Sequence, residues 1–381
     1  MVDKIKSTGI TFDDVLLVPG YSDFSRADIS LKTRISKRIS IDIPFTSAPM
    51  DTVTESTLSI ALGSVGGLGI IHRNLSVENQ AKEVEKVKKL KLKVGAAIGT
   101  SKGFEDRVKA LINAGADLIA LDSAHGFTSS LIKALKFIKK QYPKVDVMAG
   151  NIATSDGARA LILAGADSLR VGMGPGAICT TRIVSGMGIP QITAILETSR
   201  AAAKSGVPVI ADGGIKFSGD ITKALAAGAS ACMMGSFFAS CEEALGQTYR
   251  LSPAQIPARF KSIIGKNPKA TYLFKSYRGM GSVGAMKKGE KIKSEDEYHG
   301  KNYSDRVLVA EGVEGLVPVK GSVKQVIDQA IGGITSGMYY VGVRSILELQ
   351  KKSSFIQITH ASLTESHPHN ILVTNPGENY V

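Results

Sequence analysis

The chain has 381 residues, of which 43% are hydrophobic and 21% charged, and a formal net charge of +13 at pH 7. These values exclude a disordered chain and are typical of one large α/β domain or two domains of ordinary size. No apolar run approaches the roughly 18 residues of a membrane helix, and the opening MVDKIKST lacks a signal-peptide core.

Cysteine content and charge distribution indicate the cellular compartment of the protein and the class of molecule that it binds. Three cysteines without close pairing patterns favour a reducing compartment, so we expect a cytoplasmic protein. The lysines are spread over predicted surface helices such as 82–93 and 133–140, and no basic module interleaved with aromatic residues is present. We therefore expect no nucleic-acid partner, whereas a small anionic substrate such as a phosphate ester suits the charge.

Eight strands alternating with helices are expected along the first two thirds of the chain. Amphipathic helices at 77–90 and 104–114 separate short, continuously apolar runs of the kind found in strands covered on both faces. The alternation predicts a (β/α)8 TIM barrel, with a doubly wound open sheet as the main competitor. The predicted strands are 45–48, 67–71, 93–98, 118–122, 146–149, 168–171, 207–211 and 231–235.

An internal repeat supports the barrel. Segments 112–122 (INAGADLIALD), 162–172 (ILAGADSLRVG) and 225–235 (LAAGASACMMG) each contain a helix end, a glycine and a short apolar strand. Glycine suits the left-handed residue that ends a helix, and an open sheet does not need this internal similarity. Active sites of this fold lie at the carboxyl ends of the strands, so the residues that follow each strand are the candidates for chemistry.

The chain continues past the eighth strand into extensions at the catalytic face. We expect a helical insertion at about 246–270, a glycine-rich segment at 277–286 and a polar stretch at 287–306 without apolar periodicity. A polar stretch between glycine-rich segments, within 277–321, is a candidate for a mobile flap over the barrel mouth; the alternative is a solvated surface loop.

The last two strand ends carry a candidate phosphate site. Barrels commonly bind phosphate with backbone amides from the loops after strands seven and eight. Gly213, Gly214, Gly235 and Ser236 lie in these loops. Asp212 precedes the glycines and is placed to accept hydrogen bonds from ribose hydroxyls, unless it is a plain helix N-cap.

Cys179 lies in the loop GMGPGAICTTR, which follows the predicted strand 168–171. It could pack in the interior, sense redox state or act as a nucleophile, and its place at the catalytic face favours the nucleophile. We expect Arg182 to lower the pKa of its thiol. Cys232 and Cys241 lie in or beside an apolar strand, so we expect both to be structural.

Two other site types are not expected. The chain has no Cys/His spacing for zinc, and His367 and His369 form the only close histidine pair. A strand–GxGxxG–helix unit with a following acid is also missing, so a nicotinamide cofactor would have to bind without a Rossmann module.

Motifs spread over nearly the whole chain resemble those of the inosine-5′-monophosphate (IMP) dehydrogenases and their relatives, the guanosine-5′-monophosphate (GMP) reductases. The matching motifs are TFDDVLLVPG (11–20), SAPMDTVTE (47–55), GLGIIHRN (67–74), VGAAIG (94–99), GMGPGAICTTRIVSGMGIPQ (172–191), IADGGIKFSGD (210–220), MMGS (233–236), YRGMGSVGAM (277–286), AEGVEGLVPVKG (310–321) and ESHPHN (365–370).

The resemblance implies specific roles for residues at these motifs. Cys179 would attack C2 of the purine, hydride would leave to NAD, and water would hydrolyse the covalent adduct to xanthosine monophosphate (XMP). The substrate-binding set would be Ser47, Asp212, Gly213, Gly214, Gly235, Ser236, Tyr277, Gly279, Met280, Gly281 and Glu311. The set around the nicotinamide would be Asp122, Ser123, Asn151, Arg170 and Gly172.

The resemblance also implies a potassium site and a homotetramer. Gly172, Gly174 and Cys179 are similar to the family's carbonyl donors to K⁺, which Glu365, Ser366 and His367 of a neighbouring subunit would complete. Many family members carry paired CBS modules between the second helix and the third strand. Here 84–99 runs through without room for them, so we expect a single catalytic barrel domain over 1–381.

Two departures from the dehydrogenase pattern keep the reaction open. Ala177 stands where the phosphate loop normally has serine, which would cost a hydrogen bond worth roughly 1.5–3 kcal/mol to a charged acceptor. An ungapped count back from Glu311 puts Glu297 and Tyr298 at the Arg-Tyr pair of the flap, whose arginine activates water. Either Glu297 would act as the base, or Thr181 and Glu311 would relay the proton.

Three functions therefore remain at this point. Flap length, AEGVEG, SGMGIPQ and ESHPHN favour the NAD-dependent dehydrogenase. The missing arginine and CBS modules favour a reductase that converts GMP and NADPH to IMP and ammonia. A nucleotide-binding pseudoenzyme that kept the pocket and lost turnover is the third.

Overall fold

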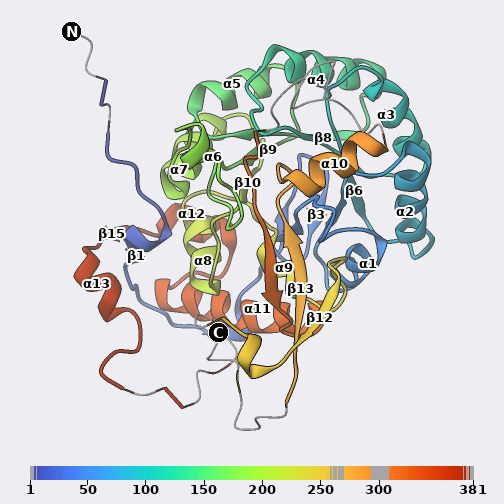
Figure 1. Cartoon of the computed structure of the whole chain (residues 1–381). Helices are drawn as coiled ribbons and strands as arrows, with labels where there is room; N and C mark the ends of the chain where they lie inside the picture. Colours follow the sequence, from blue (N-terminus) through green and yellow to red (C-terminus); the bar gives the residue numbers. More distant parts are fainter. Residues whose placement is uncertain are drawn as a thin grey trace.

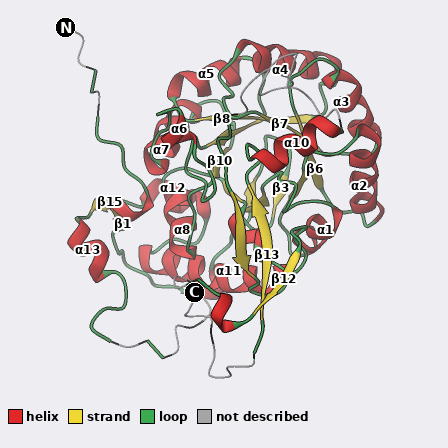
Figure 2. Ribbon diagram, in the orientation of Figure 1, coloured by secondary structure: helices red, strands yellow, loops and turns green. Residues whose placement is uncertain are grey.

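Eight parallel strands form a ring in which each strand pairs with its neighbour in the sequence, as the TIM-barrel prediction required (Figures 1 and 2). The computed structural model describes residues 4–5, 7–257, 260, 264, 270–292, 309–371, 373–374 and 377. The bridge between Thr46 and Leu68 joins the first strand to the segment before the second and closes the ring. The barrel strands are β4 Phe45–Ser47, β5 Gly69–Ile71, β6 Val94–Ile98, β7 Leu118–Asp122, β8 Asp146–Ile152, β9 Ser168–Val171, β10 Val209–Asp212 and β11 Ala231–Met234.

Helices cover the outside of the ring (Figure 2). Several begin at a serine or threonine whose side chain accepts a backbone amide of the first turn, as Ser76, Thr128 and Thr154 do. The eighth outer position is taken by the late helix α11, which packs against α8 and α1. The outer helices are α1 Ser56–Ser64, α2 Val77–Lys89, α3 Phe104–Asn113, α4 Ser129–Gln141, α5 Ser155–Leu163, α7 Gln191–Ala202, α8 Ser218–Ala226 and α11 Val323–Val341.

The core has two layers, as expected for strands that are buried on both faces. Ile70, Met148 and Met233 are fully buried inside the ring. A larger layer packs the other strand faces against the helices. The hairpin of β2 Thr33–Arg34 and β3 Ser40–Ile41 contributes Ile35 and Ile41 to the inner layer.

The internal repeat has the structure that the sequence predicted. Gly115, Gly165 and Gly228 each follow a helix end and have φ between +94° and +112°. This left-handed conformation costs glycine little, and the next residues form β7, β9 and β11.

The segment between β11 and α11 differs from the predicted helical insertion. β12 Thr248–Leu251 pairs antiparallel with β13 Tyr272–Arg278, and β13 pairs with β14 Glu314–Pro318. Helical structure in 246–257 is limited to the short η3 Pro253–Gln255. The prediction was wrong here because the strands are stabilised by partners distant in sequence, which leave no local periodic signal.

The polar stretch 287–306 is only partly described. α10 Val283–Lys291 covers its first residues, although the sequence there shows no apolar periodicity. Ser282 caps this helix by accepting the Ala285 amide. Glu297 and Tyr298 lie outside the described residues.

The remaining elements surround the barrel. They are η1 Phe12–Asp14, β1 Val15–Leu17, η2 Arg26–Asp28, α6 Thr181–Val184, α9 Ser236–Ala239, α12 Ile346–Lys352, β15 Phe355–Gln357 and α13 His360–Glu365. β1 pairs antiparallel with β15, so the segment that precedes the barrel strands lies beside the segment that follows α12.

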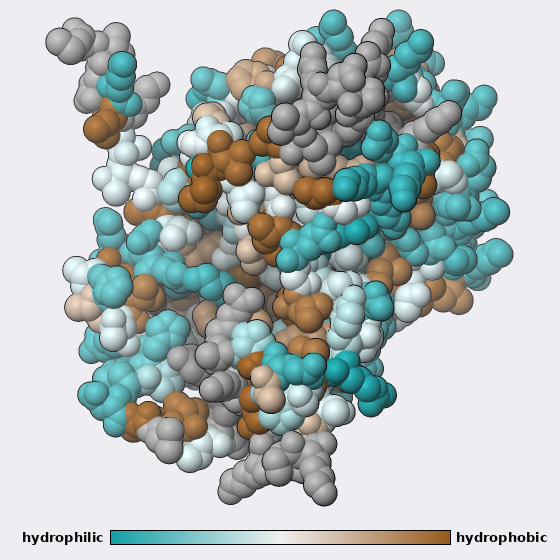
Figure 3. Space-filling view, viewed as in Figure 1, coloured by the Kyte–Doolittle hydropathy of each residue, from teal (hydrophilic) through white to brown (hydrophobic). Residues whose placement is uncertain are grey.

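The connection between α2 and β6 and the hydrophilic outer surface both relate to predictions made from the sequence. Residues 90–93 connect α2 directly to β6. Hydrophilic side chains gather on the outer edge formed by α2 and α3 (Figure 3), and the exposed Lys86 and Lys89 belong to it. In the described part of the chain, no helix combines the length and apolarity required to cross a bilayer.

Candidate active site

A cavity of about 1010 Å³, including the open solvent at its mouth, lies at the carboxyl ends of the barrel strands. Loops after β4, β7, β9, β10 and β11 and the carboxyl end of β8 form its walls, together with segments beside β13 and β14. The structure brings sixteen of the predicted site residues to this one cavity: Asp122, Ser123, Asn151, Arg170, Gly172, Gly174, Cys179, Thr181, Asp212, Gly213, Gly235, Tyr277, Gly279, Met280, Gly281 and Glu311.

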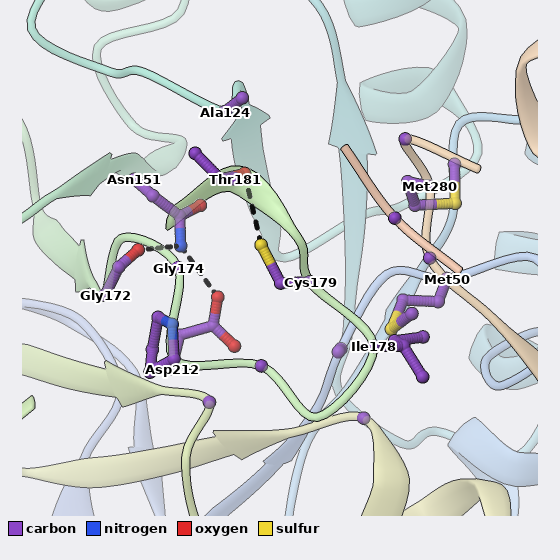
Figure 4. A pocket seen from close by; sticks show the side chains of 18 of the residues that line it. Met50, Ala124, Asn151, Gly172, Gly174, Ile178, Cys179, Thr181, Asp212 and Met280 are labelled. Carbon is purple, nitrogen blue, oxygen red and sulfur yellow. Dashed lines mark hydrogen bonds between the residues drawn. The ribbon is translucent and has the colours of Figure 1, made fainter. Parts of the chain in front are cut away.

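The loop that carries Cys179 leaves β9 through a turn that requires glycine. A Cβ on Gly172 would lie 2.1 Å from the carbonyl oxygen of Asp212, and one on Gly174 would lie 2.7 Å from Cγ of Arg182. Both glycines have positive φ, at +151° and +79°. The turn lets the loop fold back over the strand ends, so the half-buried Cys179 lies in the cavity wall (Figure 4).

A hydrogen-bonded chain begins at the Cys179 thiol. Its Sγ donates to Oγ1 of Thr181 at 3.2 Å, and Thr181 Oγ1 donates to Oε2 of Glu311 at 2.8 Å. Arg182, expected to act on the thiol, instead donates from Nη2 to the Ile189 carbonyl at 2.8 Å. The thiol is therefore connected to a carboxylate through a hydroxyl, which can carry a proton in either direction.

Backbone pairing fixes Glu311 beside the nucleophile loop. The Thr180 amide donates to the Glu311 carbonyl at 3.0 Å, and the Glu311 amide donates to the Gly281 carbonyl at 3.1 Å. Val313 continues the arrangement by donating to the Ile178 carbonyl at 2.9 Å. Glu311 thus lies between the cysteine loop and the Met280–Gly281 turn.

A row of alternating charges forms another wall of the cavity. Arg170 donates from Nη1 to Asp122 at 2.5 Å and from Nε to Asp212 at 2.8 Å, while Arg73 donates to Asp122 at 3.3 Å. Asn151 donates to Asp212 at 2.8 Å and to the Gly172 carbonyl at 2.9 Å (Figure 4). The row holds Asp122 and Asp212, which come from different strands, in a fixed relation.

The pKa shifts of this row follow from burial and charge. Burial alone would raise the pKa of Asp122, but the positive charges of Arg170 and Arg73 outweigh it and lower the pKa. For Arg170, burial would lower the pKa, but Asp212 and Asp122 together raise it above its usual range. Both carboxylate and guanidinium are therefore held in their charged forms.

Tyr277 closes the cavity near Gly235. Its hydroxyl lies 3.8 Å from Sδ of Met50, and a Cβ on Gly235 would lie 2.5 Å from that hydroxyl. Burial, with the nearby negative charge of Asp212, raises the pKa of Tyr277 well above its usual range. The phenol therefore remains protonated and can donate a hydrogen bond.

The other predicted residues lie outside this cavity or outside the described chain. Ser47 is fully buried and accepts a hydrogen bond from Thr54 at 2.9 Å. Gly214 lies in the loop after β10 and Ser236 begins α9 after β11, and neither lines the cavity. Glu365, Ser366 and His367 lie at the exposed end of α13, where the His367 ring packs on Phe217 at a centroid distance of 6.3 Å.

Several cavity residues were not predicted from the sequence. All except Gly312, which precedes β14, lie directly after a barrel strand or within the cysteine loop, where the strand-end rule could have found them. They are Ala48, Pro49, Met50, Ala124, Met173, Pro175, Gly176, Ile178 and Gly312.

Comparisons with known proteins agree with this geometry. A family model described as the IMP dehydrogenase / GMP reductase domain matches residues 9–369. The chain is 41% identical to an inosine-5′-monophosphate dehydrogenase of Borreliella burgdorferi, over 97% of this chain and 99% of that protein. It is 42% identical to the protein of that name from Cryptosporidium parvum (98% of each chain) and 38% identical to that from Aquifex aeolicus (100% and 99%). With this extent of similarity, the chain belongs to the IMP dehydrogenase / GMP reductase family.

Proposed function

We propose that this chain oxidises IMP to XMP with NAD through a covalent bond between Cys179 and C2 of the purine. The observation that carries the proposal is the position of the Cys179 thiol in the cavity wall, hydrogen bonded to Thr181 and through it to Glu311. The relatives compared above all carry the dehydrogenase name, which favours this reaction over the reductase.

The first half of the reaction forms a carbon–sulfur bond. The thiol loses its proton, Sγ attacks C2 of IMP, and the hydrogen on C2 leaves as hydride. NAD supplies the hydride acceptor. Thr181 and Glu311 provide a path for the thiol proton, since each is within hydrogen-bond distance of the next.

The second half cleaves that bond. Water adds to C2, the carbon–sulfur bond breaks, and the products are XMP and the regenerated thiol, which takes back a proton from the water; the one proton that the whole reaction releases is the one that left the thiol in the first half. A base must take a proton from the water, and the Thr181–Glu311 pair is the described group able to do so. Glu297 and Tyr298, the flap pair, remain predictions from the sequence.

The nucleotide fits the side of the cavity at Asp212 and Tyr277. Asp212 can accept from ribose hydroxyls, and Gly213 and Gly235 line the cavity beside it. The phosphate would meet the backbone amides of these two glycines and of their chain neighbours Gly214 and Ser236, which do not line the cavity. Met280, Gly281 and Glu311 would contact the base, next to the cysteine that attacks it.

The described residues also suit a nicotinamide. Asp122, Ser123, Asn151 and Arg170 line the cavity, and Ala124 and Asp212 lie on different sides of Cys179 in Figure 4. A cofactor at Asp122 and a nucleotide at Asp212 would therefore approach the same sulfur. The charged row between these two acids would keep the two binding places in register.

For potassium, one chain supplies only part of the expected ligand set. The Gly172 carbonyl accepts a bond from Asn151, and Glu365, Ser366 and His367 lie on the separate C-terminal segment. We propose that a homotetramer brings that segment of one subunit to the Gly172–Cys179 loop of the next. No catalytic step is derived from the ion.

We further propose a cytoplasmic enzyme with one catalytic barrel domain and no CBS modules. All three cysteines are free, as is usual for proteins of a reducing compartment. The direct α2–β6 connection supports the simple domain organisation.

Two measurements on the purified chain test the reaction. NADH formation from IMP and NAD is expected, with an IMP-derived adduct on the Cys179 peptide by mass spectrometry after acid quench. NADPH consumption with GMP and no reaction with IMP would establish the reductase instead. Saturable IMP binding with neither turnover nor adduct would identify a pseudoenzyme.

A further inference from the structure

A buried carboxylate, Asp51, lies directly behind the nucleotide wall of the cavity. Its side chain is inaccessible to solvent, and it follows Met50, which lines the cavity. Asp51 is not one of the cavity residues, and the proposed mechanism does not use it. An ionised group in such a place must be compensated by partners, so those partners define what it does.

Arg278 is the principal partner of Asp51. Arg278 Nε donates to Oδ1 at 3.0 Å and Nη2 donates to Oδ2 at 2.5 Å, a bidentate pair. Side chains alternate along β13, so Tyr277 faces the cavity while Arg278 faces Asp51. The pair therefore fixes β13 from the side opposite to the nucleotide.

Two further contacts connect Asp51 to α10. Asn74 donates to Asp51 at 2.9 Å and, from the same nitrogen, to the Ala285 carbonyl at 3.1 Å. Lys288 Nζ lies 3.7 Å from Asp51. The first turn of α10 is thus held from the barrel side, and its Gly284 amide donates to Glu314 of β14 at 2.7 Å.

These contacts surround the turn proposed to contact the base. Met280 and Gly281 lie between Arg278 and α10, both of which are attached to Asp51. The Gly281 carbonyl accepts from the Glu311 amide, and the Glu311 carbonyl accepts from Thr180 beside the nucleophile. A displacement at Asp51 would therefore reach the base turn, Glu311 and the cysteine loop.

We infer that Asp51 is a positioning residue for IMP binding: through Arg278 and Asn74 it holds the Met280–Gly281 turn against the base and beside Cys179. This inference rests on the proposed function. It assigns Asp51 no contact with substrate. The Met280–Gly281 turn depends on Asp51, whereas the nicotinamide side of the cavity at Asp122 is held by its own partners Arg170 and Arg73.

The test compares Asp51→Asn with a matched control, Asp146→Asn. Asp146 is also a buried carboxylate paired with an arginine, Arg38, at 2.5 Å, but it lies at the amino end of β8, remote from the cavity. For each variant, calorimetry gives the Kd for IMP, steady-state kinetics give KM for NAD, and thermal unfolding gives Tm.

Asp51→Asn is expected to raise the Kd for IMP about tenfold or more, which is a modest loss of binding free energy. The KM of this variant for NAD should stay within about twofold of the wild-type value. Asp146→Asn is expected to lower Tm without changing the Kd for IMP. Equal Kd values for IMP in wild type and Asp51→Asn would overturn the inference, as would parallel changes in the Kd for IMP and KM for NAD.

Arg278→Lys covers the case in which Asp51→Asn does not fold. Lysine keeps the charge near Asp51 but cannot form the bidentate pair. Its Kd for IMP should rise several-fold, and a wild-type value would again overturn the inference. The Kd can be measured without turnover, so the two proposals can fail separately. If the wild type binds IMP without oxidising it, only the proposed reaction is refuted. If the wild type oxidises IMP and both Asp51→Asn and Arg278→Lys bind IMP as the wild type does, only the positioning role is refuted.

Discussion

The hydroxyl of Thr181 bridges the Cys179 thiol and the Glu311 carboxylate, at 3.2 Å from one and 2.8 Å from the other. Glu311 is 132 positions along the chain from Cys179, and backbone pairing of Cys179 with Gly312 brings the two segments together. Thr181 and Glu311 are therefore placed to transfer the proton of the Cys179 thiol.

Glu311→Gln and Thr181→Val should each lower kcat by about 10²–10⁴-fold, the range for loss of a general base. Thr181→Ser retains the hydroxyl and should stay within about tenfold of wild type by the same reasoning. Rapid-quench experiments would show the adduct accumulating in the slow variants if hydrolysis is the affected step. Wild-type turnover in Thr181→Val would remove Thr181 from the proton path.

Cys179→Ala should abolish NADH formation and leave IMP binding largely intact, because the thiol forms the covalent bond but contributes little binding energy. Isothermal calorimetry with IMP and a turnover assay measure the two properties separately. Cys232→Ala is the control, since Cys232 is fully buried in the core, and it should lose stability but retain turnover. Turnover by Cys179→Ala would refute the assignment of the nucleophile.

Iodoacetamide at pH 8 should alkylate Cys179 in the native protein and spare the other two cysteines. Burial raises the pKa of Cys241 to about 12 and raises the pKa of Cys232 further, so neither forms thiolate at this pH. Peptide mass spectrometry after timed quenching gives the rates, and IMP should protect Cys179. All three should react in denaturant; comparable native rates for Cys179 and Cys241 would contradict the burial.

Asp122→Asn should reduce the free energy of unfolding by about 3–5 kcal/mol near pH 7, because it leaves Arg170 and Arg73 without their shared carboxylate. The pKa of Asp122 is lowered in the folded state. Its stabilisation is therefore present above the ordinary value of about 3.9 and is lost as the pH falls through the lower folded pKa. Urea titrations should show the difference between wild type and variant narrowing below about pH 4. Asp156→Asn, at an exposed pair with Arg159, should change little at any pH.

Glu297→Arg restores the arginine that the dehydrogenase resemblance leads us to expect in the flap. If hydrolysis of the adduct limits turnover, this variant should hydrolyse it faster than wild type in single-turnover experiments. Glu290→Arg makes the same change of charge on the exposed face of α10 and should leave the rate unchanged. An equal effect of both variants would indicate a general electrostatic influence rather than a role of position 297.

Local patterns in the amino-acid sequence were enough to predict the barrel. Apolar runs such as 118–122, glycines such as Gly115 and amphipathic stretches such as 77–90 each carry their signal within a few residues, and all have the predicted structure. The same rule, applied to strand ends, located most of the cavity, because parallel strands deliver their carboxyl ends to one face.

Only the tertiary structure decided which groups meet. Chain order alone pairs neither Glu311 with Thr181, which the family resemblance had suggested, nor Arg278 with Asp51, because each contact joins segments far apart in sequence. For the same reason β12 was mistaken for helix. Arg182 was expected at the Cys179 thiol because it is close in sequence, but the fold of the loop turns Arg182 to the Ile189 carbonyl and places Thr181 at the thiol. Propensity and periodicity act over one turn or one strand, whereas hydrogen bonds and ion pairs depend on three-dimensional proximity, which only the folded chain defines.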